Sequence, residues 1–241
     1  MLDLVFVEVL KLRRSLALLL CCAAPLFVAL MCFFLLINGR TAPDWERFLL
    51  GVAALWSFAM LPLTVTALTL LLAQQEHGGK IWRQLLALPL PRWRLFAAKL
   101  ILAAGLVGAM HGGLLLLAPA AGWAGGLVRP DLAPTGAFDF AKLAQVLAAM
   151  WASALLMVVL QLWAALRFRS FVPPLVLGIS GTFAAVAATA AKQGVFFPWL
   201  MPVQALASDP ARAELALALG AGGSLVAAAA LLLHLPRHTF D

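Results

Sequence analysis

The sequence has few charged residues for its length. Of its 241 residues, 11% are charged and 64% are hydrophobic, whereas a soluble domain has about 25% charged and about 45–50% apolar residues. The mean hydropathy is +1.02. This composition excludes an ordinary soluble domain and predicts that the bilayer is the main solvent. A chain of this length suits about six spans of ~20 residues with short loops.

Cysteine is scarce, and its placement excludes a metal or redox pair. Cys21, Cys22 and Cys32 all fall in the first apolar run, without a CxxC motif and without an adjacent His or carboxylate. Buried thiols behave as small apolar residues. Leu19 and Leu20, before Cys21, are not the small residues of a lipoprotein signal, so we expect the run to be retained as a first helix.

Six apolar runs are long enough to cross a bilayer, which predicts an all-α integral membrane protein with one transmembrane domain over residues 1–241. Closed barrels need alternating strands, and these runs are continuous. The fifth run is the least regular, because Pro173 and Pro174 open it and Gly178 and Gly181 interrupt it. The runs are residues 16–37, 48–73, 100–121, 143–166, 171–191 and 215–235.

The segments between the runs differ in charge. The N-terminus, residues 74–99, residues 167–170 and the C-terminal tail hold eleven Lys and Arg against four acids, a net charge of +7. The remaining segments hold six of each sign, a net charge of 0. Cytoplasmic loops of membrane proteins carry the excess of Lys and Arg. We therefore predict a multi-pass protein of the plasma or inner membrane with both termini in the cytoplasm, and no nucleic-acid partner.

The six runs contain no Asp, Glu, Lys or Arg, which argues against a proton-coupled pump. Ser57, Ser153 and Ser180 have no partner residues typical of an intramembrane protease, so we expect no catalytic residues. His111 has no second metal ligand at helical spacing, so we expect no metal site. A few polar residues within the runs are expected either to form interhelical hydrogen bonds or to line a substrate path: Thr64, Thr66, His111 and Gln161.

Residues 74–99 carry the most information. Gly78 and Gly79 can end the second helix, and Pro89 and Pro91 can end a short helix after them. Between these two pairs, apolar residues fall on one face of a helix and polar residues on the other. We predict an amphipathic helix at the cytoplasmic side, with a plain interfacial anchor as the alternative. The apolar face has Ile81, Trp82, Leu85 and Leu86, and the polar face has Lys80, Arg83 and Gln84.

Three motifs, by their order along the chain around the six runs, resemble those of the type-two permeases of ABC exporters, which include the lantibiotic-immunity permeases; the most informative is given first. The first is Glu76-x-x-Gly79-x-x-Trp82-x-x-Leu85, followed by Leu88-Pro89-x-x-Arg92 and Lys99, which resembles the coupling helix of that family. The second is the basic lead-in Glu8-x-x-Lys11-x-Arg13-Arg14-Ser15. The third is the outer junction Phe196-Phe197-Pro198-Trp199-Leu200-Met201-Pro202.

The resemblance implies a permease subunit that is not itself an enzyme and that exports an amphiphilic or hydrophobic substrate, such as an antimicrobial peptide or another antibiotic. No G-x-x-x-x-G-K-[ST] loop is present, so ATP and magnesium would bind a separate ATPase dimer. A second permease chain, identical or homologous, would complete the path within the membrane lipid. The residues implied to contact the ATPase are Glu76, Gly79, Lys80, Trp82, Arg83, Leu85, Leu86, Pro89 and Arg92.

Two features of the sequence allow more than one interpretation. Phe197, Pro198, Trp199 and Pro202 could form an interfacial aromatic belt, an outer gate or a short re-entrant hairpin. The whole chain could also be a non-transporting membrane scaffold or assembly protein, whose amphipathic helix binds partners or lipid. A lipid-modifying enzyme has the least support, because no polar cluster lies in the apolar runs.

Overall fold

The computed structural model describes residues 2–77, 90–189 and 191–237 of the chain. Over these residues the fold is helical and contains no strand; one isolated β-bridge joins Asp44 to Thr135. In chain order the elements are α1 (Leu2–Lys11), α2 (Leu16–Ile37), α3 (Trp45–Leu55), the π-helix η1 (Trp56–Met60), α4 (Leu61–His77), α6 (Arg92–Val128), η2 (Pro130–Leu132), α7 (Phe140–Arg167), α8 (Val172–Ala187), η3 (Lys192–Phe196), α9 (Met201–Gln204), α10 (Pro210–His234) and η4 (Leu235–Arg237).

Five of the helical segments in the described residues are long and apolar enough to cross a membrane. They coincide with five of the six predicted runs, and α2 has the predicted bounds. The others extend beyond their runs, most of all α6 with 37 residues, or about 55 Å at 1.5 Å per residue. A hydrocarbon core is about 30 Å thick, so the ends of α6 project beyond it.

The predicted count of six spans is not confirmed, because the fifth run forms a helix of only 16 residues, α8. Its length is about 24 Å, less than the hydrocarbon thickness. The chain then folds back through η3 and α9, and Trp199 packs against α8. A Cβ on Gly181 would lie 2.6 Å from the Trp199 ring, so glycine is required for this close approach. Trp199 and Leu200 are buried.

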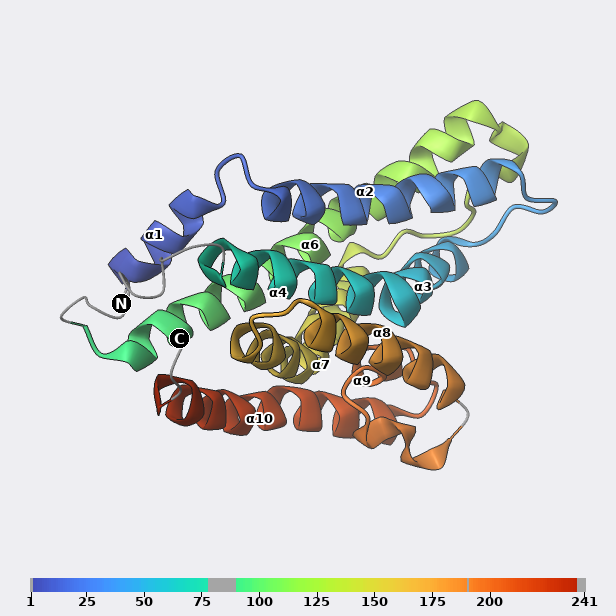
Figure 1. The fold of residues 1–241 in the computed structure, drawn as a ribbon. Coiled ribbons are helices and arrows are strands. Elements are labelled where there is room, and N and C mark those ends of the chain that lie inside the picture. Colours follow the sequence, from blue (N-terminus) through green and yellow to red (C-terminus); the bar gives the residue numbers. More distant parts are fainter. Residues whose placement is uncertain (1, 78–89, 190, 238–241) are drawn as a thin grey trace.

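The second span, Trp45–His77, lies at the centre of the bundle. Its second half, α4, contacts α2, α6, α7 and α8. Figure 1 shows α4 between α2 on one side and α7 and α10 on the other. Helix α4 approaches α8 closely, because a Cβ on Gly178 would overlap the Thr66 side chain. The second half of the central span therefore packs against four of the other long helices.

A π-helix interrupts this central span. In η1 the N–H of Leu61 donates to the carbonyl of Trp56, five residues earlier. Pro62 follows at once, and a proline has no N–H to donate and clashes with the carbonyl four residues before it. A single widened turn relieves that conflict, and π-bulges of this kind occur often at functional sites. The span thus keeps its direction while Trp56 and Ser57 remain buried.

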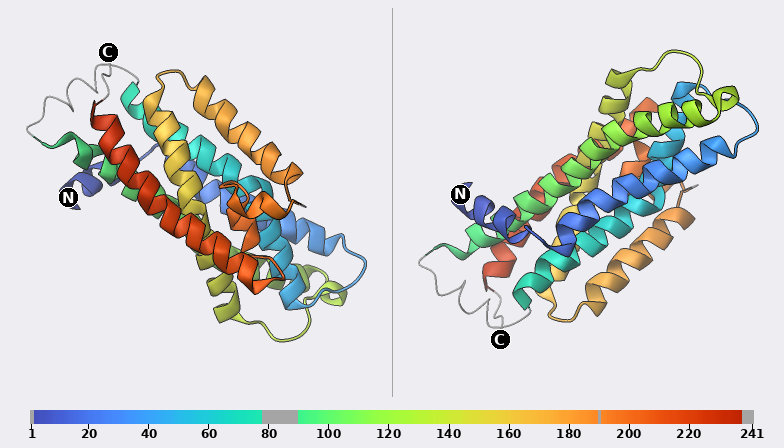
Figure 2. Two further views of the ribbon diagram at one scale, coloured as in Figure 1. Left: turned by 90° about the horizontal axis from the view of Figure 1, so that it is seen from below. Right: turned by 90° about the horizontal axis from the view of Figure 1, so that it is seen from above.

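The connecting segments gather at two ends, as both views in Figure 2 show. At one end Arg92 Nη1 donates to the carbonyl of Pro236 at 3.3 Å, so the start of α6 lies beside η4. At the other end the N–H of Trp45 donates to the carbonyl of Thr135 at 3.0 Å. The described residues of the predicted cytoplasmic segments, nine Lys and Arg against three acids with a net charge of +6, share the first end. Its assignment to the cytoplasm stays a prediction.

We predict that Gly220→Ala destabilises the bundle, whereas Gly222→Ala does not. A Cβ at Gly220 would overlap the backbone of Ser153 on α7, which cannot move aside, while Gly222 has no heavy atom within 4 Å of its Cβ position. Overpacking of this kind costs about 1–3 kcal/mol. The measurement is thermal unfolding of both variants in the same detergent. Equal melting temperatures for the two variants would contradict the close contact between α7 and α10.

Candidate functional site

Four charged side chains form a closed ring at the end of the bundle where α1, α4 and α6 meet. Glu8 accepts from Lys11 at 2.6 Å through Oε1 and from Lys99 at 2.7 Å through Oε2. Glu76 Oε1 accepts from Lys11 at 2.9 Å and from Lys99 at 2.7 Å. We call these four residues the charge ring. Its two carboxylates and two ammonium groups sum to zero.

The charge ring comes from residues just outside the apolar runs. Glu76 lies three residues beyond run 48–73 and Lys99 one residue before run 100–121, and both α4 and α6 continue through them. Glu8 and Lys11 are three apart on α1, which places them on one face of that helix. The helices therefore bring charges from three separate segments to one point.

The ring is buried. The exposed fraction is 1% for the side chain of Glu76 and 2% for that of Lys99. A buried charge without a partner costs several kcal/mol, and removing one member of a buried pair is strongly destabilising. Each of the three buried charges therefore depends on the two partners with which it pairs.

The local field favours the charged forms of both members on α1. Burial tends to raise the pKa of Glu8, but the Lys99 charge and the hydrogen bonds from Lys11 and Lys99 outweigh it and lower that pKa below its ordinary 4.5. Burial tends to lower the pKa of Lys11, but its bonds to Glu76 and Glu8 outweigh this and raise that pKa above 10.5. Both side chains are therefore charged at neutral pH.

Glu76 has a second notable property. Its other carboxylate oxygen, Oε2, is buried and has no hydrogen-bond partner among the described residues. It lies in the last turn of α4, directly before the segment that leads to α6. Arg92, also among the predicted ATPase contacts, begins α6. The other predicted contacts, and the predicted amphipathic helix itself, lie outside the described residues: Gly79, Lys80, Trp82, Arg83, Leu85, Leu86 and Pro89.

His111 is held by two hydrogen bonds inside the bundle. Its Nδ1 lies 2.8 Å from the carbonyl of Val107, to which it donates. Its Nε2 accepts from the indole N–H of Trp56 at 3.2 Å. The side chain is thus a neutral imidazole that joins α6 to the π-helix of the central span. It also borders a groove of about 290 Å³ between α6 and α7, whose walls include Gly112 and Trp151.

The other three predicted path residues are buried, and two of them contact α8. Thr66 donates to the carbonyl of Pro62 within its own helix at 2.8 Å and packs at Gly178. Gln161 Nε2 donates to the carbonyl of Pro174 at 2.6 Å, while its Oε1 is buried without a partner in the described part of the chain. Thr64 is buried on α4. Their assignment to a substrate path stays a prediction.

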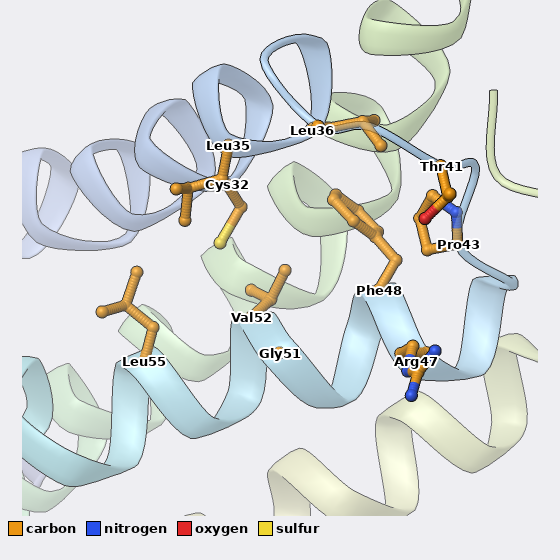
Figure 3. A pocket seen from close by; sticks show the side chains of 11 residues that line it. Cys32, Leu35, Leu36, Thr41, Pro43, Arg47, Phe48, Gly51, Val52 and Leu55 are labelled. Atoms are coloured by element: carbon orange, nitrogen blue, oxygen red, sulfur yellow. The ribbon is translucent and has the colours of Figure 1, made fainter. Parts of the chain in front are cut away.

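The structure also has a pocket that was not predicted from the sequence. About 280 Å³ in volume, it lies between α2 and α3 near the bundle end opposite the charge ring. Figure 3 shows Cys32 on α2 and Phe48 on α3 pointing into the space between the two helices, with Arg47 at its edge. Gly51 keeps the wall open, since no heavy atom lies within 4 Å of its Cβ position. We call this the α2–α3 pocket.

The predicted outer junction is only partly exposed. Trp199 is buried, and its ring stacks on Phe197 with centroids 5.6 Å apart. Pro202 lies in α9 and is buried as well, whereas Pro198 is partly exposed. The segment contacts α7 and α10. Whether it acts as a belt, a gate or a re-entrant hairpin stays a prediction.

Comparison with known proteins gives one match. A family model described as "ABC-2 family transporter protein" matches residues 4–185. The matched range runs from α1 into the last turn of α8, and it includes the charge ring, His111 and the α2–α3 pocket. No curated protein and no solved structure matches the chain.

We predict that Lys99→Met lowers stability by about 3–5 kcal/mol, because it leaves Glu8 and Glu76 buried with one cation between them. The matched control is Lys142→Met, which removes an exposed lysine from its 2.7 Å pair with Glu46; exposed pairs contribute little. Thermal unfolding in detergent measures both variants. A control that loses as much stability as Lys99→Met would contradict the special role of the ring.

An acid scan adds a pH test of the same ring. The pKa of Glu8 is lowered from its ordinary 4.5. The stability that the Glu8 carboxylate contributes is therefore fully present above about pH 4.5 and is lost as the pH falls through the lowered pKa. The melting difference between the unaltered chain and Glu8→Gln should therefore be constant from about pH 8 to 5 and shrink at lower pH. A difference that instead shrinks between about pH 8 and 6 would contradict this assignment.

Proposed function

The chain belongs to the ABC-2 transporter family, and from this premise we propose that it is the permease subunit of an ATP-driven exporter powered by a separate ATPase chain. The five apolar spans agree with a multi-pass membrane subunit. Members of such a family work with an ABC ATPase. Magnesium and ATP would bind that partner, and two permease chains, identical or homologous, would enclose the path.

The observation that carries the proposal is the charge ring. Residues 78–89 join α4 to α6. Glu76 lies in the last turn of α4 before that connection, Lys99 is the eighth residue of α6 after it, and the two side chains pair at 2.7 Å. Glu8 and Lys11 attach α1 to the same point. A force applied to the connection would therefore act on three helices together, as a rigid-body transition requires. We propose that the ATPase docks under residues 76–89.

The substrate that we propose is an amphiphilic or hydrophobic molecule, with amphiphilic peptide antibiotics as the leading class. The α2–α3 pocket supports this, because its walls are apolar and Arg47 lies at its edge. Sites for such molecules are concave and mostly apolar, with a few polar groups that fix orientation. A pocket of about 280 Å³ suits one hydrophobic side chain of a peptide, with Arg47 near a carboxylate. Outward movement is part of the proposal.

We predict that Arg83→Ala uncouples the ATPase from export without preventing membrane insertion. Residue 83 lies on the connection between α4 and α6, where a charged contact to the ATPase is proposed. The measurement is ATP hydrolysis and peptide export in proteoliposomes containing both chains. Export should fall at least about tenfold relative to hydrolysis, an effect of about 1.4 kcal/mol.

Arg129→Ala, at the opposite end of the bundle, is the control and should change neither quantity. A chain in which a flexible linker replaces residues 76–89 tests the same proposal more severely. Normal export by that chain would overturn the coupling role. If no ATPase chain co-purifies with the unaltered protein in mild detergent, the non-transporting scaffold becomes the better proposal.

We predict that Gly51→Leu reduces transport by filling the α2–α3 pocket. Gly105→Leu on α6 is the matched control, since the Cβ position there is equally free and the residue lies outside that pocket. The probe is a dansylated amphiphilic peptide with a free carboxylate, and its ATP-dependent accumulation in inverted vesicles is the readout. The first variant should lower the maximal rate of accumulation about tenfold, because the pocket lies at the end where the exported peptide would leave. An equal effect of both variants would contradict a pocket-specific role.

A further inference from the structure

A further pocket, of about 550 Å³, lies between the central span and the segment that contains α9 and the start of α10. We call it the α9–α10 pocket. One of its walls comes from α3 and the π-helix η1, and the other comes from α9 and the first turn of α10. It lies at the end of the bundle opposite the charge ring, where α3 and α10 begin. The family match ends at residue 185, so the second wall lies outside the matched range.

The wall on the central span is an apolar ladder of Leu50, Ala54 and Phe58. Residues four apart lie on one face of a helix, and eight residues extend about 12 Å along its axis. The second apolar run begins at residue 48, so the ladder starts at the edge of the hydrocarbon region and descends into it. Leu50 is 40% exposed. The ladder can therefore be reached from the surrounding lipid.

The opposite wall carries a buried amide. Gln204, in α9, lines the pocket and is 5% exposed. Its side chain forms no hydrogen bond with any residue of the described ranges. A buried polar group that lacks a partner costs free energy. The Gln204 amide therefore needs a partner within the pocket.

Arg212, in the first turn of α10, lies on the same wall with donors to spare. Its Nη2 donates to the carbonyl of Ala191 at 3.1 Å, which fixes the guanidinium. Its Nε is buried and has no acceptor in the described part of the chain. A guanidinium has five N–H donors, and its planar fork matches the oxygens of a phosphate or carboxylate. Arg212 is thus a fixed cation that is short of acceptors.

The pocket also has an anion. Asp209 lines it three residues before Arg212, and its Oδ1 caps α10 by accepting from the N–H of Ala211 at 3.0 Å. Asp209 is exposed, and these two opposite charges sum to zero. They lie just before Leu215, where the last apolar run begins, at the level of the lipid headgroups. One cation beside one anion suits a zwitterion better than an ion of a single sign.

We propose that the α9–α10 pocket binds a phospholipid with an ethanolamine headgroup. Its phosphate accepts hydrogen bonds from Arg212 and Gln204, its ammonium group donates to Asp209, and one acyl chain lies along the apolar ladder. A choline headgroup has no N–H to donate to Asp209, and a glycerol headgroup has no cation. The proposal goes beyond the permease function and does not depend on which ATPase or substrate the chain uses.

The test measures lipid binding to the full chain by native mass spectrometry in mild detergent. Phosphatidylethanolamine, phosphatidylcholine and phosphatidylglycerol with identical acyl chains are titrated, and the dissociation constant of the first bound lipid is determined for each. We expect phosphatidylethanolamine to bind about tenfold more tightly than the other two, since hydrogen bonds between charged groups are among the stronger ones.

The polar wall is tested by the double variant Asp209→Asn/Arg212→Gln. Asparagine is as good an N-cap as aspartate, so the start of α10 is preserved. The control is Arg129→Gln/Asp131→Asn, which removes an exposed pair of the same two residue types at the same end of the bundle. The preference for phosphatidylethanolamine should be lost in the first variant and unchanged in the control.

A second measurement locates the lipid in the unaltered chain and needs no substitution. Phosphatidylethanolamine with a photoreactive diazirine in one acyl chain is crosslinked to the protein, and the labelled peptides are identified by mass spectrometry. Labelling should fall within residues 50–58. An excess of unlabelled phosphatidylethanolamine should prevent it, and the same excess of phosphatidylcholine should not.

Several results would overturn the proposal. Equal affinities for the three lipids, or a preference that survives in Asp209→Asn/Arg212→Gln, would mean that the pocket does not read the headgroup. Tighter binding of phosphatidylglycerol would indicate a plain anion site without a role for Asp209. Displacement of the photoreactive lipid by the dansylated peptide would assign the pocket to the transported substrate, and labelling confined to other helices would place the lipid elsewhere.

Discussion

The arrangement of the helices at one end of this protein depends on a ring of four charges that must all be present together. Glu8, Lys11, Glu76 and Lys99 come from three helices and are joined by four ion pairs of 2.6–2.9 Å. A well-packed apolar core could be as stable as a buried ion-pair network. The ring differs from an apolar core in one respect: if one of its helices moves away, the charges on the other helices are left buried without a partner, which is unfavourable. Helices α1, α4 and α6 are therefore constrained to keep their relative positions at this end.

The middle of the bundle is held by close backbone approach. Glycine permits it at two contacts of α8, where Gly178 meets Thr66 and Gly181 meets Trp199, and at the contact of Gly220 with Ser153 between α10 and α7. Small residues are typical of helix interfaces in membranes, because burial from water does not drive association there. Between these rigid contacts lies the π-helix of the central span, tied to α6 through the bond from Trp56 to His111. The central span thus combines a close contact with α8 and one π-helical turn, an arrangement suited to a span that moves as one body.

The two ends of the molecule differ in charge, and each carries a distinct feature. The end at which the described residues carry a net charge of +6 contains the charge ring and helix α1. The neutral end contains the α2–α3 pocket and the folded-back segment around Trp199. In an ATP-driven permease, energy would enter at the first end and substrate would leave at the second. The central span connects both, since Glu76 lies in its last turn and Gly51 in its first half.

Much of the fold could be predicted from the sequence, but the sixth span and the candidate site were harder. The lengths of the apolar runs located five spans correctly and predicted a sixth, where the structure has a helix of only 16 residues. After Ala187 the chain folds back, and the Trp199 ring packs against the backbone of Gly181. The charges of the ring lie just outside the apolar runs, a position typical of loops, although the helices continue through them. That Glu8 and Lys99 share one ring is a property of the packing between distant segments.

The sequence by itself determined that this is a helical membrane protein, where five of its spans lie, and which of its segments are rich in cations. Those properties follow from composition and short-range pattern, because each residue's transfer free energy and each helical turn depend on near neighbours. Only the tertiary structure decided which charges pair and where α8 stops. Those properties depend on contacts between segments that are distant in the sequence. A shift of a few ångströms between two helices decides whether a charged side chain has a partner.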